Sequence, residues 1–313
     1  MSQDDGKEDV REAIDQSASG APAAGEAVRD MFSADEIFQR IVASANAEID
    51  SSGRELFFSG LAAGFAITLT FLLHAVLTAA VPNDRTHLLG SLLYPVGFVY
   101  IIMGRYQLYT ENTLPPVALT LTRVISVPSL LRVWGVVLVA NVTGAALGAF
   151  VLAHSGVMTP EVAKVGAEFA SKAVETPWWD LFFKAVFAGW LVAGLVWLLH
   201  ASRDSVTRFV LVFVIFLCIP VAELYHVVVS TCDAFYYVFE EGAAVLPVLW
   251  DFVFPVLLGN TVGGVFLVTL VNYAQTQRRI PGDEHERRVL GYREWLLGGI
   301  ADRGRSGSAQ QDD

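Results

Sequence analysis

Charged residues are scarce in this chain. Of its 313 residues, only 17% are Asp, Glu, Lys or Arg, against about 25% in ordinary soluble domains. Hydrophobic residues make up 54%, and long uncharged runs separate the charged segments. This composition excludes an ordinary water-soluble domain and predicts a protein of the lipid bilayer.

Cysteine, basic charge and catalytic motifs are also rare or missing. The two cysteines, Cys218 and Cys232, lie in apolar surroundings, which excludes a disulfide framework and a thiolate metal site. The net charge of -11 argues against a nucleic-acid partner. The sequence contains no His-Glu-x-x-His, no Gly-x-Ser-x-Gly and no Cys or His cluster with metal-ligand spacing. We therefore expect neither an enzyme nor a bound cofactor.

Six hydrophobic runs are long enough to cross a bilayer, which takes about 20 helical residues. They lie at 56–80, 88–108, 130–153, 181–199, 209–231 and 246–273. The predicted fold is an all-α integral membrane protein with its six-span domain at 54–275. Around this domain we expect a disordered acidic tail at 1–30, an amphipathic helix on the membrane surface at 31–53, and a polar tail at 276–313. A polar stretch between Pro160 and Pro177 has helical spacing and is expected to lie outside the membrane.

The basic residues predict the orientation, because Lys and Arg accumulate in short cytoplasmic loops. One set of connections holds Arg123, Arg132, Arg203, Arg208, Arg278, Arg279, Arg287 and Arg288. The opposite set holds fewer basic residues: Arg85, Lys164 and Lys172. We therefore expect a multi-pass protein of the plasma or bacterial inner membrane. Both tails, including the one at 1–30 that carries no signal peptide, are expected in the cytoplasm.

An internal repeat is visible in the hydrophobic runs. The third and sixth share Asn-x-x-Gly, at Asn141 to Gly144 and at Asn260 to Gly263. The first and fourth add a weaker echo, with Leu61-Ala62-Ala63-Gly64 beside Phe187-Ala188-Gly189-Trp190. Repeats of three spans must insert with opposite orientation, so we predict two inverted three-helix repeats. In such folds the remaining pair, the second and fifth spans, carries the broken helices.

Polar groups interrupt both of those spans. The second contains Arg105 and Glu111, and the fifth contains Glu223 and His226. An ionisable group at membrane depth costs a few kcal/mol, so these side chains should face protein or water. Non-helical backbone at that depth is tolerated only where it lines a cavity or is buried by protein. We predict a break in each span, and an ion pair between Arg105 and Glu111 that such a break would permit.

Five motifs occur together in a fixed order along the chain. They are Tyr94-Pro95-Val96-Gly97; Gln107-Leu108-Tyr109-Thr110 with Asn112; Leu131-Arg132-Val133-Trp134-Gly135 leading to Asn141; His226; and Gly259-Asn260-Thr261-Val262-Gly263-Gly264. In this order the chain resembles the formate/nitrite transporter family, and the segments 105–113 and 226–230 resemble a divergent branch of it. The resemblance implies an aquaporin-like fold and a homopentamer. It also implies that each protomer of the transporter domain, 54–275, has a pore for small monovalent anions, with protons as a further partner.

The resemblance also implies roles for single residues. Leu108 and Tyr109 would narrow the pore from the cytoplasmic side, and Thr110 would hydrogen-bond near His226 in the middle of the pore. A histidine there can protonate near cellular pH, and a dry constriction passes a neutral acid far more readily than an ion. The other expected residues are Asn112 and Ile219 along the path, Arg105, Glu111, Glu223, Asn141 and Asn260 in a structural or gating polar network, and Arg208 in the cytoplasmic vestibule.

The segment around the histidine departs from the family's pattern. Tyr225 stands where the family has a glutamate, Ser230 where it has an asparagine, and Glu223 is the candidate to replace the missing acid. Arg208 stands at a lysine position, and Gly189 at an asparagine position. These departures leave the transported anion open.

Three plainer interpretations stay open beside the transporter. A neutral-solute channel of the aquaporin type is the alternative function, although the Asn-Pro-Ala signature is missing from both halves. His226 is also readable as a core histidine with satisfied hydrogen bonds. Asn141 and Asn260 are equally readable as caps of broken-helix ends.

Overall fold

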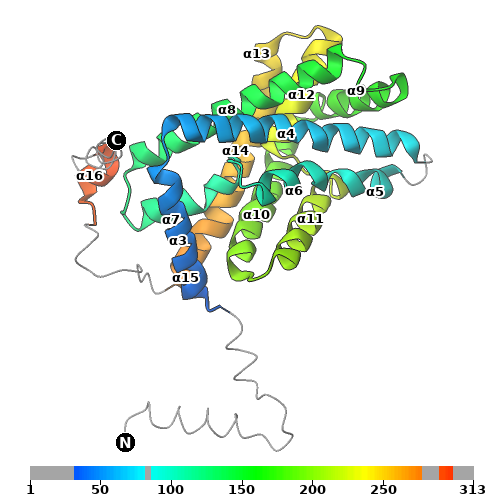
Figure 1. Ribbon diagram of the computed structural model, residues 1–313. Helices are drawn as coiled ribbons and strands as arrows, with labels where there is room; N and C mark the ends of the chain where they lie inside the picture. The colour runs from blue at the N-terminus through cyan, green and yellow to red at the C-terminus, as the bar shows by residue number, and fades with distance from the viewer. Residues whose placement is uncertain (1–31, 82–85, 277–288, 299–313) are drawn as a thin grey trace, which may run out of the picture.

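The computed structural model describes residues 32–81, 86–276 and 289–298, and the regular elements of these ranges are all helices (Figure 1). Four helical stretches are long and apolar enough to span a membrane: α4 (Gly53–Ala80), α8 (Val127–His154), α10 (Trp178–Ala201) and the stretch Val245–Gln275. The first three keep one face buried and turn large apolar side chains outward, as bilayer-spanning helices do. The predicted tail at 1–30, most of the tail at 276–313, and Arg85 lie outside the described residues.

The stretch Val245–Gln275 changes its helical form along its length. It consists of α13 (Val245–Val248), η3 (Leu249–Val253), α14 (Phe254–Val262), η4 (Gly263–Leu270) and α15 (Val271–Gln275), where η3 and η4 are π-helical. α14 packs along α10, and α4 packs along α8 in the same way. A Cβ at Gly144 would clash with the Leu61 carbonyl oxygen, and one at Gly263 with that of Val186. Both glycines therefore allow close helix packing.

The second and fifth hydrophobic runs are each split. The second forms α5 (Thr86–Gly90), η1 (Ser91–Leu93) and α6 (Pro95–Met103), and after a break it resumes as η2 (Glu111–Thr113) and α7 (Pro115–Leu121). The fifth forms α11 (Ser205–Val221) and, after a break at 222–226, α12 (Val227–Glu241). The second helix thus stops at Met103, before the predicted end at 108. The fifth run continues beyond its predicted end at 231, because α12 keeps a buried face as far as Tyr236.

The amphipathic helix is α3 (Ala34–Asp50), which begins at a capping box between Ser33 and Glu36. Hydrogen bonds from the Ser33 backbone and hydroxyl hold the pKa of Glu36 below its usual range. The buried face of α3 (Ile37, Phe38, Ile41, Val42 and Ala45) packs on α7, α10 and α15. This corrects the expectation of a surface-bound helix, because the protein itself covers the apolar stripe that lipid was expected to cover.

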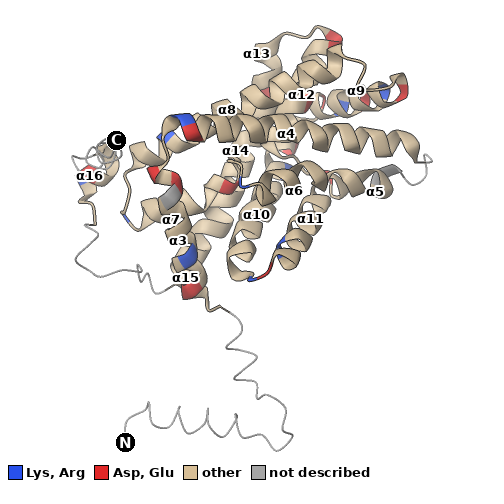
Figure 2. Ribbon diagram, viewed as in Figure 1, with Lys and Arg blue, Asp and Glu red and all other residues tan. Residues whose placement is uncertain are grey.

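Two short helices mark the two ends of the bundle. α9 (Pro160–Val174) packs on α4 and α12 at one end, which we call the α9 side. The end that holds α3 is the α3 side, where α16 (Tyr292–Leu297) also lies beside the start of α8 (Figure 1). The rings of Phe38 and Tyr273 are 6.0 Å apart there, so the start of α3 meets the end of α15. Charged residues gather at these two ends, and the helices between them carry few (Figure 2).

Candidate functional site

An asparagine side chain holds each helix break in place. The Asn141 Oδ1 atom accepts a hydrogen bond of 2.9 Å from the Tyr109 amide, and its Nδ2 atom donates to the carbonyls of Gly60 (2.8 Å) and Gln107 (2.9 Å). Asn141 is fully buried. Both of its amide hydrogens and its carbonyl oxygen therefore serve the backbone of α4 and of the second span's break.

Asn260 repeats this arrangement at the other break. Its Oδ1 atom accepts from the Val227 amide at 2.8 Å, and its Nδ2 atom donates to the carbonyls of Ala185 (2.8 Å) and Tyr225 (2.9 Å). Asn260 is also fully buried. Each asparagine thus bridges the amide and carbonyl on either side of one residue, which is Leu108 in the second span and His226 in the fifth. Buried backbone groups that leave the helix are satisfied in this way.

The backbone turns out of each first half-helix in the same conformation. Arg105 has φ 59° and Glu223 has φ 52°, a region that costs a residue other than glycine about 1–2 kcal/mol. The next amide donates back across the turn in both cases, from Tyr106 to Ile101 at 3.0 Å and from Leu224 to Ile219 at 2.9 Å. The two breaks therefore have the same backbone conformation and differ in their side chains.

Thr110 and His226 meet where the two breaks approach each other. The Thr110 Oγ1 atom lies 2.8 Å from the His226 Nε2 atom, and both side chains are 1% exposed. Among the described residues, the Thr110 hydroxyl has no other partner, so we assign it as the donor to Nε2. The histidine then carries its proton on Nδ1, an atom without a partner in the described part of the chain.

Aromatic rings surround the imidazole of His226. The Phe98 ring meets it edge-on at 4.9 Å between centroids, and the Phe216 ring lies 6.1 Å away. These two phenyl rings stack on each other at 3.6 Å. The imidazole of His226 therefore lies against two apolar rings, and Thr110 provides the one hydrogen bond that this side chain forms with the described residues.

The remaining residues expected along the path are all buried. Leu108 and Ile219 are fully buried, and the Tyr109 hydroxyl lies 2.9 Å from the Thr261 hydroxyl. Asn112 donates to the Gln107 side chain at 2.9 Å and to the Leu108 carbonyl at 3.0 Å. Its Oδ1 atom is buried without a partner among the described residues. Leu108 and Tyr109 thus lie with Thr110 in the break of the second span, Asn112 follows it in η2, and Ile219 lies in α11 shortly before the break of the fifth.

The predicted ion pair between Arg105 and Glu111 is wrong. Between two described residues, ion pairs join Lys164 to Glu168, Lys172 to Glu223, and Lys184 to Glu223, and none of them includes Arg105 or Glu111. Arg105 is exposed because the chain reverses at its positive φ, whereas Glu111 is half-buried in η2 on the far side of the break.

Glu223 pairs with residues other than His226, and Arg208 hydrogen-bonds to the backbone. The Glu223 Oε1 atom lies 2.8 Å from Lys172 Nζ, and its Oε2 atom lies 3.6 Å from Lys184 Nζ. Glu223 therefore does not take the place of the missing acid beside His226, because the turn at Glu223 directs its side chain to these lysines. Arg208, in the first turn of α11 on the α3 side, donates to the Ser202 carbonyl at 3.1 Å.

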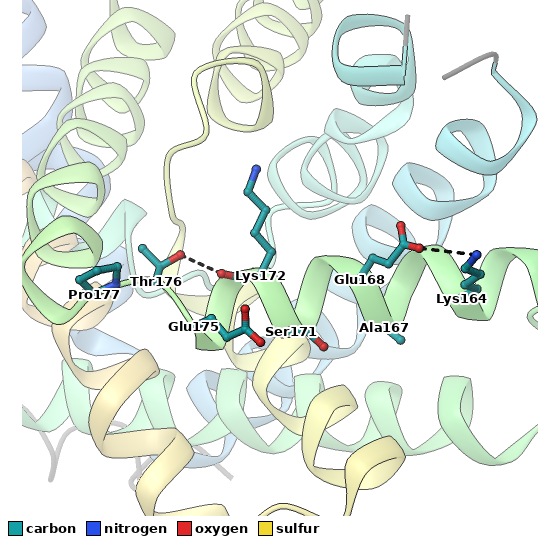
Figure 3. Close-up of a pocket in the computed structure, with 8 residues that line it drawn as sticks. All are labelled: Lys164, Ala167, Glu168, Ser171, Lys172, Glu175, Thr176 and Pro177. Atoms are coloured by element: carbon teal, nitrogen blue, oxygen red, sulfur yellow. Dashed lines mark hydrogen bonds and ion pairs between the residues drawn. The ribbon is translucent and has the colours of Figure 1, made fainter. Parts of the chain in front are cut away.

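Two cavities lie on the α9 side. The larger, of about 640 Å³, is an open groove along α9 and the turn after it, where charged side chains such as Lys164 and Glu168 face solvent (Figure 3). The smaller, of about 240 Å³, extends between α4, α9 and α12 to His226. Its polar lining consists of His74, Thr78, Ser91, Tyr94, Lys172, Glu223, Tyr225, His226, Ser230 and Asp233. We call this smaller space the α9-side cavity.

Two charged residues of this region, Lys184 and Asp233, were not singled out from the sequence, and Lys172 was considered there only as a guide to orientation. Asp233 lay just outside the predicted fifth span. The spacing of His226, Ser230 and Asp233 was the signal that could have found it, because these residues follow one another at helical intervals on one face. No such signal links Lys172 and Lys184 to Glu223, since they come from other helices.

The long apolar helices and the two helices that stop in the bundle's interior define a polytopic helical membrane protein. The family model described as formate/nitrite transporter matches residues 35–274, and this chain belongs to that family of membrane transporters.

Named relatives agree with this family. The chain is 28% identical over 242 residues to the inner membrane protein YfdC of Escherichia coli, a match that covers 76% of this chain and 77% of YfdC. It is 25% identical over 237 residues to the formate channel FocA of Haemophilus influenzae, covering 68% of this chain and 83% of FocA. The predicted family is confirmed, and YfdC belongs to the divergent branch that segments 105–113 and 226–230 indicated.

Solved structures support the same fold. One described as an FNT family ion channel has a TM-score of 0.70 at 19% identity and covers 77% of this chain and 98% of its own. Another, described as a pentameric formate channel with formate bound, has a TM-score of 0.61 at 19% identity and covers 71% and 96%.

Proposed function

We propose that this protein is a homopentameric channel or carrier of the plasma or bacterial inner membrane, with a pore for small monovalent anions such as formate or nitrite in each protomer. The observation that carries the proposal is the contact of Thr110 with His226 at 2.8 Å, where both broken spans approach each other. The pore follows Leu108, Tyr109, Thr110, Asn112, Ile219 and His226.

The proposed topology of the transporter domain, residues 54–275, is six membrane crossings in two inverted three-helix repeats, as in aquaporins. This topology brings the two helix breaks together. The equivalent hydrogen bonds of Asn141 and Asn260 support the repeat, since each belongs to the third span of its half. An even number of crossings is supported by the meeting of α3 and α15 on one side. Half-helices that stop inside the bundle are typical of transporter sites at the bilayer midplane.

The orientation follows from the described basic residues. Those in the connections on the α3 side are Arg54, Arg123, Arg132, Arg203 and Arg208, whereas α9 and the start of α10 carry Lys164, Lys172 and Lys184 with several acids. This bias supports a cytoplasmic α3 side, with both termini in the cytoplasm and Arg208 in the cytoplasmic vestibule.

The mechanism follows from the surroundings of His226. A bare anion that passes between the phenyl rings of Phe98 and Phe216 and the imidazole loses its hydration shell. This loss is very costly in a medium of low dielectric constant. The N–H on Nδ1 gives such an anion a hydrogen bond. A proton from hydronium in bulk water makes the imidazole cationic; the Nδ1–H bond then breaks as an O–H bond forms on the anion, which leaves a neutral histidine and a neutral acid that crosses the apolar segment. Transport of the anion together with a proton is the result.

Flux through purified protein in proteoliposomes tests this function. We expect uptake of formate or nitrite, from a panel that also includes acetate and chloride, with rates that change between about pH 5 and pH 8. Stopped-flow measurement of glycerol permeability is expected to give the rate of empty vesicles. Glycerol permeation without anion uptake would identify a neutral-solute channel instead, and absence of both would overturn the proposal. Native mass spectrometry is expected to detect five copies of the chain.

A further inference from the structure

The α9-side cavity contains a carboxyl group that the proposed mechanism does not use. Asp233 lies on α12, seven residues beyond His226, which places it about 10 Å further along the helix. His226, Ser230 and Asp233 all line the cavity. Their spacing of four and three residues puts them on one face of α12. A polar stripe thus runs from His226 toward the α9 side.

At the end of this stripe near His226, two polar side-chain atoms have no hydrogen-bond partner among the described residues. The Ser230 hydroxyl and the His226 Nδ1 atom are buried and have no partner within the described residues. Both side chains are 1% exposed. Two unpartnered polar groups that line one cavity indicate a small ligand with oxygen atoms, because buried polar groups are otherwise paired.

The side chain of Asp233 is also unpaired. It is half-buried, and it forms neither a hydrogen bond nor an ion pair with any described residue. A carboxylate without a partner at membrane depth is costly, whereas the protonated acid is not. The protonated acid can also donate a hydrogen bond. Asp233 therefore resembles a proton donor more than a fixed charge.

Basic residues beside the cavity favour the approach of an anion. Lys172 lines it and, like Lys184, pairs with Glu223, so two cations face one carboxylate. Lys172 extends from α9 on a different side from Glu175 and Ser171 (Figure 3). The lysines are 66% and 36% exposed, so they keep contact with water and attract anions from solution.

We propose that Asp233 donates a proton to the incoming anion in the α9-side cavity, so that a neutral acid reaches His226. This inference rests on the proposed function. The O–H bond of the Asp233 carboxyl breaks and leaves its electron pair on the carboxylate, while an O–H bond forms on an oxygen of the anion. Hydronium from bulk water then returns a proton to Asp233. The titratable and charged groups around it are His74 of α4, Tyr94, Lys172 of α9, Glu223 and Tyr225 of the break, and His226, Cys232 and Tyr236 of α12.

Uptake of radiolabelled formate by proteoliposomes tests this role with four proteins. These are the wild type, Asp233→Asn, Asp233→Glu, and the control Glu240→Gln on the exposed end of α12. At about pH 7 the Asn variant is expected to lose about tenfold or more of the wild-type rate, because general acids typically contribute at least this much. Near pH 5 the difference between the two rates should close, since the concentration of neutral acid in bulk solution rises about tenfold for each unit by which the pH falls. The Glu variant should keep most of the rate, and Glu240→Gln all of it.

The outcomes separate this proposal from the proposed function. Equal pH profiles for the wild type and Asp233→Asn would overturn the role of Asp233 and leave the anion pore intact. Loss of uptake by Asp233→Asn at every pH would indicate a structural role and would also overturn it. Absence of formate uptake by the wild type would refute the function itself.

Discussion

The two helix breaks have the same backbone and different chemistry. Each is held by one buried asparagine that bridges the peptide groups around a single residue, and each follows a residue with positive φ. The bridged residue is Leu108 in the second span and His226 in the fifth. At the turn, Arg105 forms no ion pair with a described residue, whereas Glu223 pairs with Lys172 and Lys184. The same backbone arrangement therefore presents an apolar side chain, Leu108, in the second span and an imidazole, His226, in the fifth.

Removing either asparagine should have the largest effect on stability. Asn141→Ala and Asn260→Ala each remove three buried hydrogen bonds. Such bonds in membrane proteins contribute about 0.6 to 1.7 kcal/mol each, so each variant should lose about 2–5 kcal/mol. Thermal unfolding in detergent measures this loss, and Asn272→Ala in the first turn of α15 is the control. Unequal losses from the two variants would show that the breaks are not equivalent.

The contact between the two breaks should affect transport more than stability. Thr110→Val removes the hydroxyl that fixes the tautomer of His226, and loss of one hydrogen bond of about 1.4 kcal/mol slows uptake about tenfold. Thr110→Ser keeps the hydroxyl and should keep most of the rate. Thr143→Val is the control, because the Thr143 hydroxyl bonds only within its own helix, to the Val139 carbonyl. If Thr110→Val took up formate as fast as the wild type, the contact between the two breaks would play no part in transport.

The two turns should respond differently to loss of charge. Glu223→Gln removes two ion pairs whose side chains are 36% to 66% exposed. Solvent screening at such sites limits the loss to about 1 kcal/mol or less. Arg105→Gln should cost nothing measurable, because Arg105 is exposed. Unfolding measured at low and high salt is the test, since added salt should remove only the Glu223 effect. An equal salt-dependent loss in Arg105→Gln would contradict this contrast.

The smallest effect concerns the start of the fifth span. The hydroxyl and amide of Thr207 hydrogen-bond to Asp204, the N-cap of α11, and hold its pKa below the usual 3.8. A pKa lower in the folded than in the unfolded state adds stability at neutral pH. That stability is lost as the pH falls through the folded value. Asp204→Ala should lower the melting temperature slightly at pH 7, and the difference should disappear in acid. Asp204→Asn, which still caps the helix, should stay close to the wild type at neutral pH.

The sequence predicted the parts of the fold that depend on local pattern. The length of the hydrophobic runs predicted the four long apolar helices. The polar residues inside the second and fifth runs predicted where those runs break. The repeat of Asn141 and Asn260 predicted that they correspond, and the structure adds that both bridge backbone groups. Sequence alone left their contacts open, because an asparagine amide can bind either a solute or the backbone.

Contacts between distant helices were the part that sequence could not supply. Glu223 was expected beside His226 because the two lie one turn apart, yet a positive φ at Glu223 directs it to Lys172 and Lys184. Arg105 and Glu111 failed to pair for a similar reason, since the backbone reverses between them. The apolar stripe of α3 fitted lipid as well as protein, and only the packing on α7, α10 and α15 decided between the two.

The pH dependence of formate uptake by His226 variants tests the central claim most directly. The claim is that His226, bridged at the break of the fifth span, supplies a titratable group at the centre of the pore. His226→Asn and His226→Phe should both change the pH profile between about pH 5 and pH 8, and the exposed control His154→Asn should leave it unchanged. Wild-type profiles in both His226 variants would contradict the claim and leave the histidine as a core residue.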